Sequence, residues 1–206
     1  MSNDDVYASG LLTRALDPVT QPAEIQAFLQ AEIDLLRDLL REGMQVLDVG
    51  CGTGRHLHLL GNRIRLGVGV DYEADYIAEA VRRAVRGHLH FVTGDATALP
   101  LRAQFDFAMC LTNTWGTMSD KTAVLREMRR LAPQRRRLVS VFSESSVAAR
   151  REWYARLGHA VVEETSEYLL TDGGLRSEHF TEARLLELIG ECAMHPLTNI
   201  ARAVIF

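Results

Sequence analysis

The sequence predicts an α/β fold in which helices flank a doubly wound, mostly parallel sheet. Two observations lead to this prediction. Short apolar runs alternate regularly with segments of helical periodicity, a pattern that requires parallel strand pairing with crossover connections. The first apolar run also ends in a glycine-rich stretch at 50–54, which is typical of a buried strand that passes through a tight loop into a helix.

The elements can be placed in order along the chain. The first 20 residues are mixed and contain Asp17-Pro18, so we expect an irregular or briefly helical arm. From Ala23 to Arg41 apolar residues recur at helical spacing, and Gly43 supplies a C-terminal stop. Strands are then expected at 45–49, 66–70, 89–92, 105–111 and 137–142. Helices are expected between them at about 53–61, 74–86 and 119–131.

The pattern changes after residue 142. A further helix is predicted over 145–157, followed by strands at 160–170 and 175–179 around the Asp172-Gly173-Gly174 turn. Thr181 is a helix cap for 182–190, and residues 197–206 are apolar strand residues.

Composition limits the class of protein. The 206 residues suit one domain, and a net charge of -4 gives no general attraction for nucleic acid or an anionic membrane. The three cysteines are widely spaced and form no zinc pattern or disulfide framework, which favours a reducing compartment. No apolar stretch approaches 18 residues, and no signal-peptide pattern is present. We therefore expect a cytoplasmic protein, a monomer or homodimer, that binds neither nucleic acid nor membrane.

The stretch from 46 to 56, Val-Leu-Asp-Val-Gly-Cys-Gly-Thr-Gly-Arg-His, is the most informative part of the chain. Its three alternating glycines permit positive φ and let a ligand lie against the backbone. A dinucleotide-binding loop would have the pattern G-x-G-x-x-G, but Arg55 stands where its third glycine would be. Asp48, just before the loop, suits a cationic ligand better than an anionic pyrophosphate.

Two later motifs add to the predicted ligand-binding site. Asp71 follows the second strand, 21 residues beyond Gly50, where a carboxylate can accept hydrogen bonds from both ribose hydroxyls. Gly94-Asp95-Ala96 follows the third strand, and the fourth strand runs into residues 112–115. Ligands of open α/β sheets lie beyond the carboxyl ends of the strands, so residues 110–115 should border the reacting group.

In order and spacing, the motifs over 46–116 resemble those of class I (Rossmann-like) S-adenosylmethionine-dependent methyltransferases. The resemblance implies a seven-stranded sheet, S-adenosylmethionine as methyl donor, S-adenosylhomocysteine as product and no metal. In this family pattern Asp48 and the glycine backbone hold the methionine portion, Asp71 the ribose, and Asp95 with Ala96 the adenine. The cofactor residues that it implies are Asp48, Gly50, Cys51, Gly52, Gly54, Asp71, Tyr72, Asp95, Ala96 and Leu111.

We predict a single methyltransferase domain. Its parts are an N-terminal arm and helix (1–43), a cofactor-binding core (44–143), an insertion that acts as a substrate lid (144–180), and a C-terminal helix with strands (181–206). The insertion is rich in aromatic residues, which could sandwich a planar acceptor or attract a cation. Packing of its helix onto the sheet is the alternative explanation. Candidate substrate residues are Tyr7, Asn113, Trp115, Trp153 and Tyr154.

The predicted reaction is methyl transfer by in-line displacement to oxygen or nitrogen of a small molecule. A general base is needed only for a protonated acceptor, and His179, Glu144 and His56 are the candidates. The chain has Leu-Thr-Asn-Thr at 111–114, where methyltransferases acting on base amino groups carry Asn/Asp-Pro-Pro-aromatic. A peptide or protein methyltransferase and a non-catalytic cofactor-binding regulator remain alternatives.

Overall fold

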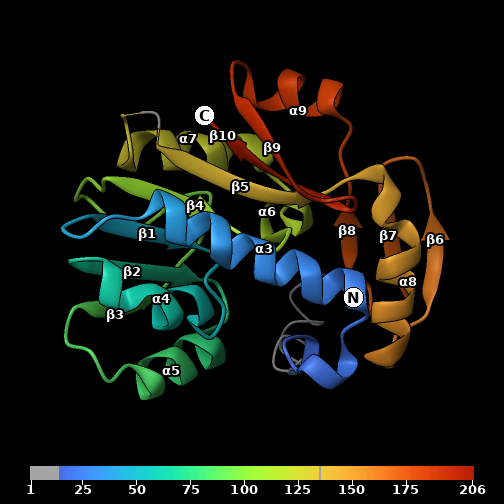
Figure 1. The fold of residues 1–206 in the computed structure, drawn as a ribbon, viewed down its shortest axis with the longest axis horizontal. Helices are drawn as coiled ribbons and strands as arrows, with labels where there is room; N and C mark the ends of the chain where they lie inside the picture. Colours follow the sequence, from blue (N-terminus) through green and yellow to red (C-terminus); the bar gives the residue numbers. More distant parts are fainter. Residues whose placement is uncertain (1–13, 135) are drawn as a thin grey trace.

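The computed structural model describes residues 14–134 and 136–206. Its main sheet has seven strands in the order β3-β2-β1-β4-β5-β10-β9 (Figure 1). The first five strands in chain order are mutually parallel, and β10 is antiparallel to both of its neighbours. The strands are β1 (Gln45–Val49), β2 (Leu66–Asp71), β3 (Leu89–Thr93), β4 (Phe107–Cys110), β5 (Arg137–Phe142), β9 (Ala193–Thr198) and β10 (Ala201–Ile205). The predicted doubly wound, mostly parallel sheet is confirmed.

Helices cover both faces of this sheet. They are α3 (Ala23–Leu39), α4 (Arg55–Leu60), α5 (Ala74–Arg83), α6 (Thr114–Thr117), α7 (Lys121–Leu131), α8 (Val147–Arg156) and α9 (Glu182–Ile189), with 3-10 turns η1 (Pro18–Thr20), η2 (Gly61–Arg63) and η3 (Glu144–Ser146). Successive strand residues point to opposite faces. Val46 packs with α3 and α4, whereas Leu47 packs in the cluster that contains α7 and α9 (Figure 1). In the described part of the chain no helix is long and apolar enough to cross a membrane.

A second, smaller sheet follows β5. Its three antiparallel strands, β6 (Val161–Glu164), β7 (Tyr168–Thr171) and β8 (Arg176–Glu178), lie beside α8 at one side of the molecule (Figure 1). The single strand expected over 160–170 is therefore wrong. The hydroxyl of Thr165 accepts hydrogen bonds from the amides of Glu167 and Tyr168 and closes a tight turn between β6 and β7.

Several boundaries also differ from expectation: the strand expected at 105–111 is limited to Phe107–Cys110, and the helix expected to reach residue 86 ends at Arg83. The short helix α6 was not predicted, and it begins four residues after the end of β4. The last apolar segment is a hairpin, because β9 starts at Ala193 and pairs with β10. Pro196 lies within β9, which is tolerated because β9 is the edge strand of the sheet. The Thr181 cap is confirmed, since its hydroxyl accepts from the amide of Arg184 at 3.0 Å.

Helix α9 provides a direct test of the packing. Leu185 is fully buried against the sheet, whereas its neighbour Leu186 is 51% exposed. We expect Leu185→Ala to lower the free energy of unfolding by about 2–5 kcal/mol, through lost transfer energy and a cavity. Leu186→Ala should change it by less than about 1 kcal/mol. Urea unfolding of both variants measures this, and equal losses would contradict the docking of α9.

Candidate active site

The loop between β1 and α4 runs very close to neighbouring segments. The amide of Gly50 donates to the carbonyl of Val70 at 2.7 Å, which ties the loop to the end of β2. Gly50 has a φ of +70°, and a Cβ atom there would lie 2.4 Å from Cγ2 of Thr114. Glycine is therefore required at this position. Gly52 and Gly54 also have positive φ, of +53° and +76°.

Asp71 ends β2 and holds the glycine loop from the side. The amide of Gly52 donates to Oδ2 of Asp71 at 2.7 Å, and the amide of Glu73 donates to Oδ1 at 3.0 Å. Burial raises the pKa of Asp71, and these backbone hydrogen bonds act against that rise. One carboxylate thus joins the loop after β1 to the loop after β2.

The loop after β3 places a second carboxylate nearby. Oδ1 of Asp95 accepts hydrogen bonds from the amide and the hydroxyl of Thr97, at 2.8 and 2.7 Å. A Cβ atom on Gly94 would lie 2.8 Å from the ring of Pro100, so the backbone before Asp95 is tightly packed. This packing fixes the position of Asp95 and of the following residue, Ala96.

Three titratable side chains lie buried behind the glycine loop. Oδ2 of Asp48 is 3.9 Å from Nδ1 of His56 and has no hydrogen-bond partner among the described residues. Nε2 of His56 lies 3.6 Å from Oε2 of Glu32 on α3. Burial raises the pKa of Asp48 to about 6; His56 counteracts this rise, and the charges of Asp71 and Glu32 add to it.

Glu32 is not among the residues predicted from the sequence. Its carboxylate is 1% exposed and accepts hydrogen bonds from the amide of Thr112 at 2.6 Å, from the Thr112 hydroxyl at 2.8 Å and from the Ser140 hydroxyl. Burial opposes ionisation of Glu32, but hydrogen bonds from His56 and these groups outweigh it and lower its pKa. One signal was available: Glu32 lies four residues after Phe28, within the apolar stripe of α3.

A strained turn follows β4. Thr112 and Asn113 have φ of +53° and +57°, which is uncommon for residues with a side chain. Oδ1 of Asn113 accepts from the amide of Phe142 at 3.1 Å, and Nδ2 donates to Oγ of Ser177 and to the carbonyl of Glu178. The turn is therefore held by α3 on one side and by β5 and β8 on the other.

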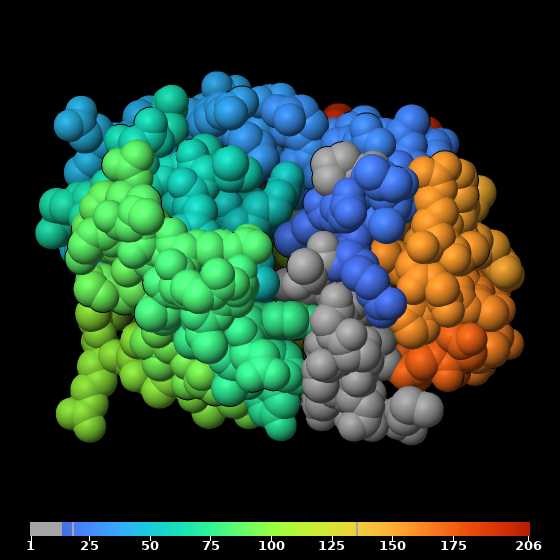
Figure 2. Space-filling model, turned by 90° about the horizontal axis from the view of Figure 1, so that it is seen from below, coloured from blue at the N-terminus to red at the C-terminus, as the bar shows by residue number. Residues whose placement is uncertain are grey.

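These segments surround a cavity of about 640 Å³ at the carboxyl ends of the parallel strands. Its further wall comes from α8 and β8, together with Ala15 and Leu16. In Figure 2 the green segments that include α5 and the orange segments of the insertion lie on opposite sides of the molecule. The predicted site residues that line the cavity are Gly50, Gly52, Asp71, Tyr72, Asp95, Ala96, Asn113, Trp153 and Tyr154.

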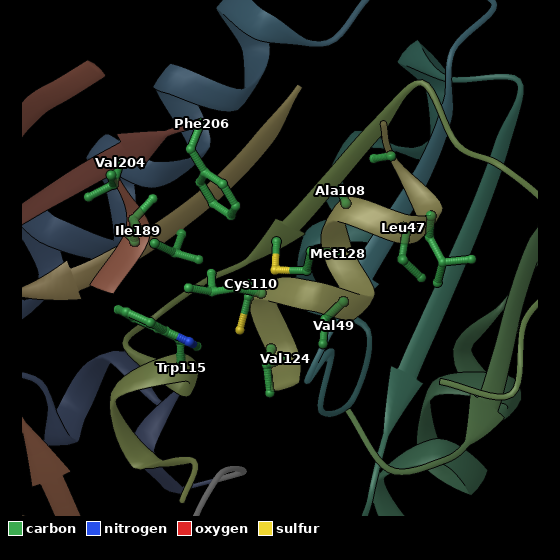
Figure 3. Close-up of a cluster of buried hydrophobic side chains, with 14 of the residues drawn as sticks. Leu47, Val49, Ala108, Cys110, Trp115, Val124, Met128, Ile189, Val204 and Phe206 are labelled. Atoms are coloured by element: carbon green, nitrogen blue, oxygen red, sulfur yellow. The ribbon is translucent and has the colours of Figure 1, made fainter. Parts of the chain in front are cut away.

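Other predicted residues lie behind this lining. They are Asp48, Cys51, Gly54, Leu111 and Trp115. The indole of Trp115 is fully buried; its Nε1 donates to the carbonyl of Lys121 at 3.2 Å, and its ring stacks on Phe180. Figure 3 shows Trp115 with Cys110 among the apolar side chains of the core. Tyr7 lies outside the described residues.

Comparisons with known proteins show what the chain is similar to. A family model described as a methyltransferase domain matches residues 46–134. The chain is 28% identical over 208 residues to a dTDP-4-amino-2,3,4,6-tetradeoxy-D-glucose N,N-dimethyltransferase of Saccharopolyspora spinosa, covering 91% of this chain and 79% of that protein. It is 32% identical over 133 residues to a 2-phytyl-1,4-naphtoquinone methyltransferase of Thermosynechococcus vestitus, covering 61% and 58% of the two chains. Residues 46–134 therefore match a methyltransferase domain, and the strand order of the seven-stranded sheet is typical of class I S-adenosylmethionine-dependent methyltransferases.

A solved structure supports the fold assignment. The magnesium protoporphyrin IX methyltransferase of Synechocystis PCC 6803, which was crystallised with bound SAH, superposes with a TM-score of 0.67 at 18% identity. The match covers 97% of this chain and 94% of that one. Because residues 46–134 match a methyltransferase domain with the class I glycine loop, the cofactor is S-adenosylmethionine. Within the described residues, no group of three or more His, Cys, Asp or Glu side chains is placed to hold a metal ion.

The three candidate bases of the methyltransferase all lie outside the cavity lining. His179 is buried, and its Nδ1 lies 2.6 Å from a guanidinium nitrogen of Arg150. Burial and the positive charge of Arg150 both lower the pKa of His179. Glu144 lies half-exposed in η3, 3.8 Å from Arg202, and His56 lies behind the glycine loop.

The raised pKa of Asp48 predicts a pH-dependent stability of the cofactor-free methyltransferase. The folded state keeps a proton on this carboxyl up to about pH 6, whereas the unfolded chain loses it at about pH 4. Stability therefore falls as the pH rises from about 4 to about 6, by about 2–3 kcal/mol. Asp48→Asn removes this contribution. The free energy of unfolding of the variant, relative to that of the wild type, should therefore rise by that amount between pH 4 and pH 7.5.

Urea unfolding at several pH values measures the difference between Asp48→Asn and the wild type. Asp38→Asn, at an exposed position on α3, is the matched control for removal of a carboxylate from the surface and should change stability little. A pH-independent difference for Asp48→Asn would contradict the assignment of a raised pKa to this carboxyl.

Proposed function

We propose that this methyltransferase transfers a methyl group, by in-line displacement, to an oxygen or nitrogen atom of a small molecule. The observation that carries the proposal is the cavity, which joins the edge containing Gly50, Asp71 and Asp95 to a wall containing Trp153 and Tyr154. Its volume of about 640 Å³ falls within the range of small-molecule sites, about 300–1,000 Å³.

The residues at the glycine loop fit the methionine portion of the cofactor. The sulfonium and the α-ammonium group are cations, and the unpartnered Oδ2 of Asp48 lies directly behind the loop. Gly50 and Gly52 bring bare backbone to the cavity surface, where their carbonyls can accept hydrogen bonds from the α-ammonium group. Their amides already donate to Val70 and Asp71. Asp48 acts through its charge and by supporting the loop, because its side chain does not line the cavity.

The nucleoside portion is assigned to the next two loops. Asp71 would bind the ribose hydroxyls through the sides of its oxygens left free by the two backbone amides. Asp95 would accept from the adenine amino group, and the backbone amide of Ala96 would donate to the adenine ring. Tyr72 lines the cavity yet is 63% exposed, so it offers a ring face that the adenine would cover.

When bound, S-adenosylmethionine supplies an electrophilic methyl group on a positively charged sulfur. The protein's contribution is to position the acceptor and to exclude water, which can supply a large part of the rate acceleration. The Thr112–Asn113 turn, held on both sides, gives the acceptor a fixed floor. Phe142, Trp153 and Tyr154 give it an apolar wall.

The insertion favours a small acceptor over a peptide. Helix α8 and strand β8, from within residues 144–180, form one side of the cavity, and Ala15 and Leu16 contribute from the N-terminal side. An enclosed site of this kind suits a compact molecule, and we assign the insertion the role of a lid within a single domain. The names of the two relatives, an amino-sugar nucleotide dimethyltransferase and a naphthoquinone methyltransferase, also point to small acceptors.

Calorimetric titration tests the cofactor site. S-adenosylmethionine and S-adenosylhomocysteine should bind with micromolar affinity, and NADH should not bind. Asp71→Ala should weaken S-adenosylhomocysteine binding at least tenfold, about 1.4 kcal/mol, because both ribose contacts and the support of Gly52 are lost. Asp75→Ala, on the exposed side of α5, is the control and should bind like the wild type. Unchanged affinity in Asp71→Ala would contradict the placement of the ribose.

Limited proteolysis tests the lid. Trypsin should cleave after Arg151, Arg156 or Arg176 several-fold more slowly when S-adenosylhomocysteine is bound, because the insertion then closes on an occupied cavity. Cleavage after Arg102, in an exposed loop outside the cavity lining, should keep its rate and serves as the control. Equal rates within the insertion with and without cofactor would instead favour an open groove and a peptide substrate.

A further inference from the structure

Arg150 on α8 is a fully buried cation without a carboxylate partner among the described residues. Its Nη1 donates to the carbonyl and the hydroxyl of Ser177, at 2.9 and 3.0 Å. Its Nη2 lies 2.6 Å from Nδ1 of His179, and its Nε has no partner in the described chain. These partners are neutral, so the positive charge is hydrogen-bonded but not neutralised.

This guanidinium lies directly behind the acceptor side of the cavity. It stands over the ring of Phe142, 5.0 Å from the centroid, and interacts with the side chain of Tyr154, one helical turn further along α8. Phe142, Tyr154 and Ser177 all line the cavity. Only one layer of side chains therefore separates the charge of Arg150 from a bound acceptor.

No carboxylate among the described residues forms an ion pair with Arg150. Glu164 interacts with Arg150 only at long range and is paired with Arg151 on the outer surface. Glu144 is half-exposed and lies near Arg202. Acidic side chains do line the cavity, but they come from other segments. These are the loops after β2 and β3 and the N-cap residue of α7, Asp120.

The hydroxyl of Ser177 lies between Arg150 and the cavity and can donate a hydrogen bond to a ligand. Its Oγ accepts hydrogen bonds from Nη1 of Arg150 and from Nδ2 of Asn113, at 3.0 and 3.2 Å. With both lone pairs occupied, the hydroxyl proton is left to donate, and it forms no hydrogen bond with a described residue. A second donor, Nε1 of Trp153, is buried without a described partner in the same wall. The wall thus offers donors and positive charge.

We propose that the acceptor of this methyltransferase is an anionic oxygen, a carboxylate or an ionised phenol or enol, held by the Ser177 hydroxyl in the positive field of Arg150. This inference rests on the proposed function. In the transfer, a lone pair of the anionic oxygen forms the O–CH₃ bond while the S–CH₃ bonding pair returns to sulfur. A neutral ester or ether and a neutral thioether result, and no proton is released.

This reaction agrees with the residues available. Among the described residues that line the cavity, none is a histidine, a cysteine or a lysine. An oxygen that arrives ionised needs no general base. The combination of an anionic nucleophile and a cationic methyl donor also matches the two ends of the cavity, one lined by carboxylates and the other backed by Arg150.

The test is ligand-observed NMR on the protein saturated with S-adenosylhomocysteine, using probes that share one ring. Benzoate should bind at least tenfold more tightly than benzamide and benzylammonium. At pH 8, the affinity of 4-nitrophenolate is compared with that of benzoate. The tighter of the two shows whether an ionised phenol or a carboxylate is the preferred source of the anionic oxygen. Three results would overturn the proposal. Benzoate, benzamide and benzylammonium could bind equally, or benzylammonium could bind more tightly than benzoate. Finally, neither benzoate nor 4-nitrophenolate could bind at millimolar concentration.

Variants of the wall sharpen this test. Ser177→Ala should weaken binding of the preferred anion about tenfold and leave S-adenosylhomocysteine affinity unchanged. Ser166→Ala, an exposed serine in the turn between β6 and β7, is the matched control. In Arg150→Gln the ratio of benzoate to benzamide affinity should fall towards one. Partial unfolding does not change this ratio, because it removes sites for both probes equally.

The outcomes separate the two proposals. If S-adenosylhomocysteine does not bind the wild type, the proposed function fails. If it binds but anions are not preferred, or if Ser177→Ala binds the anion like the wild type, only the anionic acceptor is refuted. The wild-type comparison of benzoate with benzamide decides the matter even where a variant does not fold.

Discussion

The turn at Thr112–Asn113 constrains both halves of the cavity. Two successive residues with side chains adopt positive φ there, a conformation that costs on the order of 1–3 kcal/mol for each residue. Glu32 offsets this cost by accepting hydrogen bonds from the backbone amide and the hydroxyl of Thr112. The side-chain amide of Asn113 bridges β5 and β8. The turn therefore joins α3, the main sheet and the insertion. Because it lines the cavity, its position determines how an acceptor faces the glycine loop.

Buried charges of opposite sign lie behind the two ends of the site. Glu32 is well compensated by hydrogen bonds, but Asp48 leaves one oxygen unpartnered, and Arg150 has only neutral partners among the described residues. Burial of an incompletely paired charge lowers stability. A cation bound near Asp48 and an anion bound near Arg150 would each relieve part of that cost. On our proposal, the sulfonium and the anionic oxygen are these two ligands.

The sequence predicted the parts of the molecule that depend on local pattern. β1 and β5 begin and end at the predicted residues, because buried parallel strands are continuous apolar runs between clear breaks. Side-chain direction depends on tertiary packing and was not predictable in the same way. Trp115 faces the core because it lies on α6, a helix too short to leave a periodic signal. Arg150 and Arg151 are adjacent arginines, yet only packing against β8 decides that the first is buried and the second exposed.

The field of Arg150 bears on the choice between oxygen and nitrogen as the acceptor atom. A nearby positive charge favours the ionised form of an acid and the neutral form of an amine, so it would activate either nucleophile. The two differ in binding. The neutral amine gains no charge attraction, and a hydrogen bond from Ser177 would occupy the lone pair that must attack the methyl group. An anionic oxygen has further lone pairs, so it can accept from Ser177 and still attack. The donor and the charge together therefore favour oxygen, although neither alone would.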